Sequence, residues 1–366
     1  MSNGSRPTHY SLLITHYSTG SRPTHYSLSI THYSTGSRPT HYSLLIIHYS
    51  TPIINYQLSI KKSMLSVILC TYNRDKYIYN VLRSIADNDY PHNLYEIVLV
   101  NNNSTDNTQA ECQRFQADYP DITFRYFVEP SQGLSYARNC GITHALGDLL
   151  VYVDDDATVN PQYLRTYADF FQRNPDAVAA GGPILPVYET QEPSWMSHYT
   201  RQLITGRLYL GSRQRQFPRG AFPGGGNACY RKTVFDAVGP FNIQLGRKGN
   251  SLIGAEEKDL FDKMTTRGMH FYYLPNAILY HIIPPHKLTP DYFQRLTYGI
   301  GVSERYRTLQ ISRKKYLSRL LKELIKWAAT ILLWLKFLIT LQPEKGNKLV
   351  AFRRNVTRGL LSTKPI

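Results

Sequence analysis

Leu149-Leu150-Val151-Tyr152-Val153-Asp154-Asp155-Asp156 is an apolar run, rich in residues that favour strands, that ends in three carboxylates. The pattern predicts a buried strand that delivers acidic side chains to the edge of a sheet. Adjacent like charges repel one another unless a positive group binds them, and carboxylate oxygens suit Mg²⁺ or Mn²⁺. The residues alone leave two interpretations open, a divalent metal site or solvated acids at a strand-to-loop junction.

Strands and helices alternate around this segment. We predict strands at Leu65–Cys70, Tyr95–Val100 and Ile122–Val128, with helices at about 77–85 and 135–145. This alternation predicts an α/β fold in which helices flank both faces of a mainly parallel sheet.

Polar side chains follow three of the predicted strands. Thr71–Arg74 follows the first, Asn101–Asp106 the second and Asp154–Asp156 the fourth. In sheets of this kind ligands bind outside the carboxyl ends of the strands. The convergence of three polar clusters on one edge favours a ligand site over a solvated turn.

The composition of the 366 residues, 42% hydrophobic and 19% charged, is typical of a globular protein. Its four cysteines form no CxxC pair and no metal-finger spacing. They argue against a disulfide framework or a zinc site and favour a reducing compartment. The formal net charge of +16 is compatible with nucleic acid, anionic lipid or phosphorylated substrates as partners.

Residues 1–63 contain a tandem repeat, in which the hexapeptide starting at Ser5 recurs from Ser21 and from Ser37. The period of 16 residues is too short for the common helical solenoids, and three copies build little core. We expect a disordered leader that is not necessarily native, with Met64 as a plausible true start.

Six segments resemble, in order, the motifs of family 2 glycosyltransferases, which have the GT-A fold. They are Ser66–Arg74, Asn101–Thr108, Gly133–Gly141, Asp154–Asp156, Gly224–Lys232 and Gly254–Leu260. The resemblance covers about Met64 to Gly301 and implies a Rossmann-like, nucleotide-sugar-binding GT-A domain at 64–301. The Gln-any-any-Arg-Trp motif of the processive synthases is not found, which favours transfer of a single sugar.

The resemblance implies a Mg²⁺ or Mn²⁺ cofactor. By the family pattern Asp156 binds the metal directly and Asp154 contacts the ribose or the metal's water shell, while Asp155 is a solvated or structural acid. In many GT-A enzymes a late histidine completes the metal shell. His281 matches that position, with a structural histidine as the alternative. The cation would act as a Lewis acid on the diphosphate leaving group.

The family pattern also implies the donor-binding residues. They are Thr71, Tyr72, Asn73, Arg74, Asn101, Arg138, Asn139 and Asp154. We expect Arg138 to face the diphosphate, with a surface salt bridge as the alternative. The family usually has an aspartate in the place of Asn101. An amide carbonyl still accepts a hydrogen bond but carries no charge, so the identity of the nucleotide is left open.

The acceptor hydroxyl needs a general base, and the family motif assigns this role to Glu257, with Glu256 as the runner-up. The alternative is a helix N-terminus enriched in acids, which the helix dipole favours. On the acceptor side, Gly225 and Gly226 would let the backbone approach a sugar closely, or form a flexible loop. Asn227 is a candidate for contact with a sugar hydroxyl.

Residues 302–366 read as a basic and apolar helical tail. Its charge-free run Trp327–Leu335 is too short to span a bilayer. We expect an amphipathic helix at a membrane surface, with Trp327 and Trp334 at headgroup depth. A helix packed on the catalytic domain or in a dimer interface is the alternative.

Together these features predict an inverting, metal-dependent glycosyltransferase, cytoplasmic and peripheral at the inner face of the cell membrane. It would transfer one sugar from a nucleotide-diphosphate sugar donor to a glycan or lipid-linked acceptor. A catalytically inactive sugar-nucleotide-binding protein is the alternative. A nucleic-acid-binding protein would interleave basic and aromatic residues on a groove-reading element. Here the basic residues concentrate beside the C-terminal apolar helix, so we predict no nucleic-acid partner.

Overall fold

The computed structural model describes residues 63–249 and 251–363, together with the backbone of three segments at 10–17, 25–32 and 40–47. The chain divides into two compact units, Met1–Ile60 and Lys61–Ile366.

The described part of the first unit is a three-stranded antiparallel sheet of β1 (Tyr10–Tyr17), β2 (His25–His32) and β3 (Thr40–Ile47). Each sequence repeat supplies one strand of eight residues. The sequence predicted no regular structure here, and the strands differ from that expectation. The physical reason is that each copy contains Tyr, Ile and Thr, which favour strands. The rest of the predicted leader lies outside the described residues.

The second unit is built on an eight-stranded sheet of order β11-β13-β9-β12-β7-β4-β5-β6. The strands are β4 (Leu65–Thr71), β5 (Tyr95–Asn101), β6 (Thr123–Val128), β7 (Leu149–Asp154), β9 (Ala179–Gly181), β11 (Arg215–Gln216), β12 (Asn227–Arg231) and β13 (Phe271–Tyr273). Strands β7, β4, β5 and β6 are parallel, and β12 is antiparallel to both of its neighbours. The prediction of a mainly parallel sheet is therefore confirmed.

The strand register brings the predicted polar clusters together. Cys70 of β4 lies opposite Asp154 of β7, and Thr71 lies opposite Asn101 of β5. Residues 149–153 are buried, so the acidic side chains begin where the strand leaves the core. The carboxyl ends of β4, β5 and β7 thus form one edge, as the sequence predicted.

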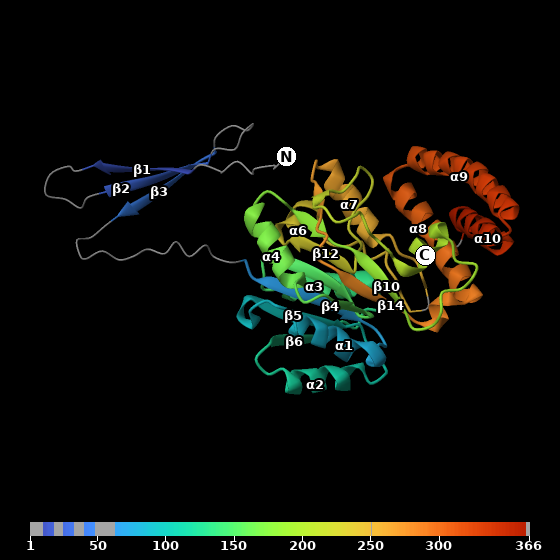
Figure 1. The fold of residues 1–366 in the computed structure, drawn as a ribbon, viewed down its shortest axis with the longest axis horizontal. Helices are drawn as coiled ribbons and strands as arrows, with labels where there is room; N and C mark the ends of the chain where they lie inside the picture. The colour runs from blue at the N-terminus through green and yellow to red at the C-terminus, as the bar shows by residue number, and fades with distance from the viewer. Residues whose placement is uncertain (1–9, 18–24, 33–39, 48–62, 250, 364–366) are drawn as a thin grey trace, which may run out of the picture. The chain divides into compact units, whose positions relative to one another are not determined.

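Helices cover both faces of this sheet (Figure 1). The helices are α1 (Asp75–Ala86), α2 (Thr108–Asp118), α3 (Leu134–His144), α4 (Tyr163–Arg173), α6 (Thr233–Val238) and α7 (Glu256–Thr266). Alternate residues of β4 enter different cores: Val67 packs with residues of α1, α2 and α4, and Ile68 with residues of α3, α6 and α7. The period of two along the strand divides the core into these two layers.

A smaller sheet of β10 (Ile184–Tyr188), β14 (Leu279–Ile283) and β8 (Ala157–Val159) lies beside the acidic segment in the chain. His281 on β14 pairs with Ala157, the residue after Asp156. Short helices η1 (His92–Leu94) and α5 (His198–Thr205), and the turn η2 (Pro285–Leu288), complete the connections. The register explains how a histidine so late in the sequence reaches the acids.

The C-terminal helices α8 (Pro290–Ile311), α9 (Arg313–Ile339) and α10 (Pro343–Leu360) pack on one another (Figure 1). The predicted boundary between 301 and 302 falls inside α8, and residues 61–366 form one compact unit. The apolar pattern after residue 302 suggested that a separate segment begins there. Helix α8 instead crosses this boundary, and it has buried residues on both sides of it.

Helix α9 buries charged side chains and exposes apolar ones, which is the reverse of a normal surface helix. Arg319, Glu323 and Thr330 are buried, whereas Ile325 and Leu332 are 71% and 68% exposed. Among the described residues, no helix is both long and apolar enough to span a membrane.

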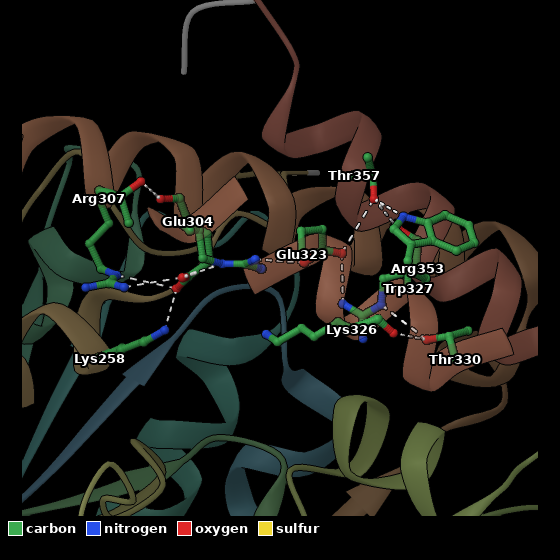
Figure 2. Close-up of polar contacts among 11 residues, drawn as sticks. Lys258, Glu304, Arg307, Glu323, Lys326, Trp327, Thr330, Arg353 and Thr357 are labelled. Atoms are coloured by element: carbon green, nitrogen blue, oxygen red, sulfur yellow. Dashed lines mark hydrogen bonds and ion pairs between the residues drawn. The ribbon is translucent and has the colours of Figure 1, made fainter. Parts of the chain in front are cut away.

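A network of charges holds the inward face of α9. Figure 2 shows the carboxylate of Glu304 between Lys258 and Arg307. Arg319 contacts both Glu304 and Glu323, and Glu323 also contacts Arg353 of α10 at 2.9 Å. The network therefore links α7, α8, α9 and α10.

Candidate active site

A cavity of about 810 Å³ lies at the carboxyl ends of β4 and β7. Its wall contains ten of the residues predicted from the sequence. They are Thr71, Tyr72, Asn73, Arg74, Arg138, Asp154, Asp156, Glu256, Glu257 and His281. The other five predicted residues are absent from the wall. They are Asn101, Asn139, Gly225, Gly226 and Asn227.

Glu256 and Glu257 begin helix α7, and both contact one guanidinium group. The Nη1 atom of Arg138 lies 2.8 Å from Oε1 of Glu256 and 2.9 Å from Oε1 of Glu257. Burial disfavours the charged form of Arg138, but the two carboxylates outweigh burial and raise its pKa. This ion pair is buried, so the surface salt bridge considered from the sequence does not describe Arg138. Its contact with a diphosphate stays a prediction.

The two glutamates differ in their surroundings. Glu256 is buried, and its Oε2 has no hydrogen-bond partner among the described residues. Burial, together with the neighbouring charge of Glu257, raises the pKa of Glu256 from 4.5 to about 7. The side chain of Glu257 is 24% exposed and lines the cavity. Both glutamates line the cavity, but only the carboxylate of Glu257 is appreciably exposed, so Glu257 is the one that an acceptor can approach.

Gly225 and Gly226 lie directly against two of the acids. A Cβ atom on Gly225 would come within 1.8 Å of Oε1 of Glu257, and one on Gly226 within 2.0 Å of Oδ2 of Asp154. Any side chain at either position would displace a carboxylate. The two glycines therefore shape the acidic side of the site, and their contact with a sugar stays a prediction.

Asn227 is fully buried and all of its hydrogen-bonding capacity is used. Its Oδ1 accepts from the hydroxyls of Tyr163 and Tyr167 at 2.8 and 2.7 Å. Its Nδ2 donates to the carbonyls of Pro183 and Ala277 at 2.8 and 3.0 Å. The side chain thus links β12 to helix α4 and to the backbone of two loops. The arrangement leaves no free group on this side chain for a sugar hydroxyl.

Asn101 and Asn139 also make structural contacts. Nδ2 of Asn101 donates to the Tyr126 hydroxyl at 2.6 Å, and its Oδ1 accepts from the Ser104 amide at 2.8 Å. Asn139 exchanges two hydrogen bonds of 2.9 Å with the backbone of Phe241. Donor contact by either residue stays a prediction.

The loop after β4 contacts the acidic segment through a hydrogen bond and an ion pair. The Tyr72 amide donates to Oδ2 of Asp155 at 3.4 Å, and Nε of Arg74 lies 3.4 Å from Oδ1. Asn73, with φ of 54°, accepts at Oδ1 from the Thr105 amide at 2.8 Å. Of the two roles considered for Asp155, the structural one agrees with these contacts. Burial raises the pKa of Asp155 to about 6, although Arg74 opposes this.

Asp156 is buried with two basic side chains. Nζ of Lys287 lies 2.7 Å from Oδ2 of Asp156, and Nε2 of His281 lies 3.3 Å from Oδ1. Nζ of Lys287 is also 3.0 Å from Nε2 of His281. Burial raises the pKa of Asp156, but the adjacent Lys287 ammonium opposes burial most strongly, and the pKa of Asp156 lies well below its ordinary value.

The tautomer of His281 follows from its partners. Nδ1 lies 2.7 Å from the carbonyl oxygen of Thr205, which only accepts, so Nδ1 carries the proton. Nε2 is then a lone pair that accepts from Lys287. A carboxylate and an imidazole lone pair suit a divalent cation. As these side chains lie, however, Lys287 binds both donor atoms, and the arrangement does not fit a metal ion in addition.

Comparison with known proteins gives the family. Residues 66–239 match the model described as glycosyl transferase family 2. These matched residues, which lie within the second unit, belong to this family. A glucosyl-dolichyl phosphate glucuronosyltransferase of Haloferax volcanii is 27% identical over 246 residues, which cover 66% of this chain and 76% of that protein. The succinoglycan biosynthesis protein ExoM of Rhizobium meliloti is 25% identical over 244 residues, 65% of this chain and 72% of that protein.

A solved structure supports the fold of this family 2 glycosyltransferase. The mannosyltransferase PcManGT of Pyrobaculum calidifontis, in complex with GDP-Man and Mn²⁺, has a TM-score of 0.53 at 17% identity. The likeness covers 83% of this chain and 89% of that one. The predicted GT-A fold and the assignment as a glycosyl-transferring enzyme are confirmed.

Two basic residues of this glycosyltransferase site were missed in the sequence. Lys287 follows a Pro-Pro turn, and only its distance of six residues from His281 gave a signal. Arg247 lines the cavity from a loop after Gly246, and no motif marks it. Its side chain has no hydrogen bond or ion pair with any other described residue. Burial opposes its charge, but Tyr292, Asp156 and Asp154 outweigh burial and raise the pKa of Arg247.

Proposed function

We propose that this family 2 glycosyltransferase transfers a single sugar, with inversion, from a nucleotide-sugar donor to a glycan or lipid-linked acceptor. The observation that carries the proposal is the meeting, in one cavity, of the Glu256–Glu257 pair with the acids that follow β7. The names of the two relatives, one with a dolichyl phosphate lipid and one with succinoglycan biosynthesis, support an acceptor of this kind.

Glu257 is the general base of the proposed reaction. Its carboxylate takes the proton of the acceptor hydroxyl, and the oxygen attacks the anomeric carbon as the bond to the diphosphate breaks. A single displacement of this kind inverts the configuration at that carbon. Arg138 holds both glutamates, so it acts as a positioning residue for the base.

The leaving diphosphate needs positive charge nearby. Arg247 is a candidate for this contact because it lines the cavity and its side chain is unpaired among the described residues. Asp154, which also lines the cavity, is the proposed contact to the donor ribose. A Mg²⁺ or Mn²⁺ cofactor at Asp154, Asp156 and His281 stays a prediction from the sequence. None of the steps above depends on it.

The outward apolar face of α9 is the proposed contact with a membrane surface. It contains exposed leucines and isoleucines, among them Leu321, Leu324 and Ile325. Exposed Lys322 and Lys336 on the same helix add attraction to anionic lipid. This placement supports a peripheral protein that meets a lipid-linked acceptor at the cytoplasmic face of a membrane. The two tryptophans contribute less than expected, because their indole N–H groups donate to α10.

The test is a screen of the full chain against nucleotide sugars, scored by release of nucleoside diphosphate with and without acceptor. The panel contains UDP and GDP sugars, each offered with a dolichyl-phosphate-linked sugar and with a soluble oligosaccharide. The proposal predicts release that depends on the acceptor for at least one pair. Binding of a donor without release in every pair would favour the catalytically inactive sugar-nucleotide-binding protein instead.

A further inference from the structure

Lys287 is a buried lysine that lines the cavity. It is 2% exposed, although lysines are rarely buried without a partner. Its ammonium group lies 2.7 Å from the carboxylate of Asp156 and 3.0 Å from the imidazole Nε2 of His281. Asp156 and His281 are two of the three residues to which the family resemblance assigns a divalent metal.

The chain holds both partners of Lys287 in fixed orientations. Nδ1 of His281 donates to the Thr205 carbonyl, which aims Nε2 at the ammonium. The amide of Ile282 donates to the carbonyl oxygen of Asp156 at 2.8 Å, which joins the acidic segment to β14. The Lys287 amide donates to the Pro284 carbonyl at 3.1 Å, so the turn η2 directs the lysine back over His281.

We infer that Lys287 is a tethered cation that holds the position of the divalent ion and supplies positive charge to the donor's diphosphate. The inference rests on the proposed function for its ligand, a nucleoside diphosphate. Its basis is that one ammonium group binds both the carboxylate and the imidazole lone pair. A metal ion reaches these atoms only if Lys287 leaves them.

Charge in the rest of the cavity agrees with this role. Arg74 is paired with Asp155, and Arg138 with the two glutamates. Lys287 lines the same cavity as Arg247, whose side chain has no partner among the described residues. A diphosphate bound in this cavity would meet positive charge from both side chains.

The experiment has two arms, both on the full chain. In the first, UDP and GDP are titrated calorimetrically in EDTA and again with Mn²⁺, using the wild type and Lys287→Met. In the second, Mn²⁺ binding without nucleotide is measured by electron paramagnetic resonance. Lys326→Met is the matched control, because Lys326 lines the same cavity but is exposed and pairs with no other described side chain.

The wild type is expected to bind a nucleoside diphosphate equally well in EDTA and in Mn²⁺. Lys287→Met is expected to lose about tenfold or more of this affinity in EDTA, because a charged hydrogen-bonding group is gone. Its Mn²⁺ affinity is expected to rise at least about tenfold over the wild type, because Asp156 and His281 are freed. Lys326→Met should match the wild type in the metal arm.

Two results would overturn the inference: a wild type that binds nucleotide only with Mn²⁺, or a Lys287→Met variant whose Mn²⁺ affinity is unchanged. If the wild type binds no nucleotide at all, the proposed function fails, and the metal arm still decides the position of the cation. If Lys287→Met does not fold, Lys287→Gln, which keeps a donor toward Asp156, replaces it in both arms.

Discussion

Glu256 and Glu257 are neighbours in sequence, yet burial separates their chemistry. Glu256 keeps its proton to a higher pH than an ordinary glutamate because its carboxylate is buried beside a second carboxylate. Glu257 faces the cavity, where an acceptor can reach it. The residue that a sequence motif assigns by position is thus distinguished from its neighbour by its environment.

This difference predicts a pH dependence of stability. Between its ordinary pKa of 4.5 and the raised value of about 7, folded Glu256 holds a proton that the unfolded chain has released. The free energy of unfolding should therefore fall as the pH rises through this window, and Glu256→Gln should remove that part of the decline. Urea unfolding at pH 5 and pH 7 measures it. The control is Glu111→Gln, at a half-buried glutamate of α2 that pairs with Arg114. An identical decline in Glu256→Gln and the wild type would refute the assignment.

Asn227 offers a second test at this scale. Asn227→Ala leaves the hydroxyls of Tyr163 and Tyr167 and two carbonyls without partners, so the free energy of unfolding should fall by about 2–4 kcal/mol. Urea denaturation measures the loss, with the exposed Asn107→Ala as control. Unchanged stability together with a raised KM for the acceptor would instead support the sugar contact predicted from the sequence.

The sequence predicted well which residues lie at the site. It predicted less well which groups each of them contacts. Asp154 and Asp156 reach the cavity because the carboxyl ends of parallel strands share an edge. Glu257 reaches it from the start of α7, and His281 from β14 of the smaller sheet. The full satisfaction of Asn227 depends on tyrosines some 60 residues away in the chain, and no local pattern encodes such a contact.

At the scale of elements, helix α9 differs most from what its hydrophobic pattern predicts. Its apolar face was expected to be its binding face, and the structure adds that a charged face packs inward on α8 and α10. Hydrophobic periodicity locates the two faces of a helix. It does not say which face meets the protein, because here ion pairs replace apolar packing.

The network predicts that α9 depends on Glu304. Removing its charge leaves Arg307 and Arg319 buried without their shared partner, so Glu304→Gln should cost about 3–5 kcal/mol of unfolding free energy. The exposed pair variant Asp291→Asn should cost less than about 1 kcal/mol. Urea denaturation of both variants makes the comparison, and equal losses would contradict the role of the network.

The pKa of Glu304 adds a condition to this test. Burial opposes its charge, but Lys258 and Arg307 outweigh burial and lower the pKa of Glu304 to about 2. Its contribution to stability is therefore present above pH 4.5 and is lost as the pH falls toward 2. The difference between wild type and Glu304→Gln should shrink over that range.

At the scale of the whole molecule, the outward face of α9 predicts binding to anionic vesicles. Ile325→Ser with Leu332→Ser removes two exposed side chains, each worth about 1.5–3 kcal/mol if fully buried in lipid. Vesicle flotation of the full chain should show at least about a tenfold loss of binding. The control is Val128→Ser with Leu146→Ser, which alters two exposed apolar residues elsewhere. Equal binding by the two double variants would remove α9 as the membrane contact.

The most direct test of the proposed enzyme compares Glu257→Gln with the wild type in acceptor-dependent release of nucleoside diphosphate. We expect release to fall at least about a hundredfold, because the general base is gone, while calorimetric binding of the nucleoside diphosphate is retained. Glu111→Gln should retain full activity. Undiminished release by Glu257→Gln would contradict the central claim that this carboxylate activates the acceptor.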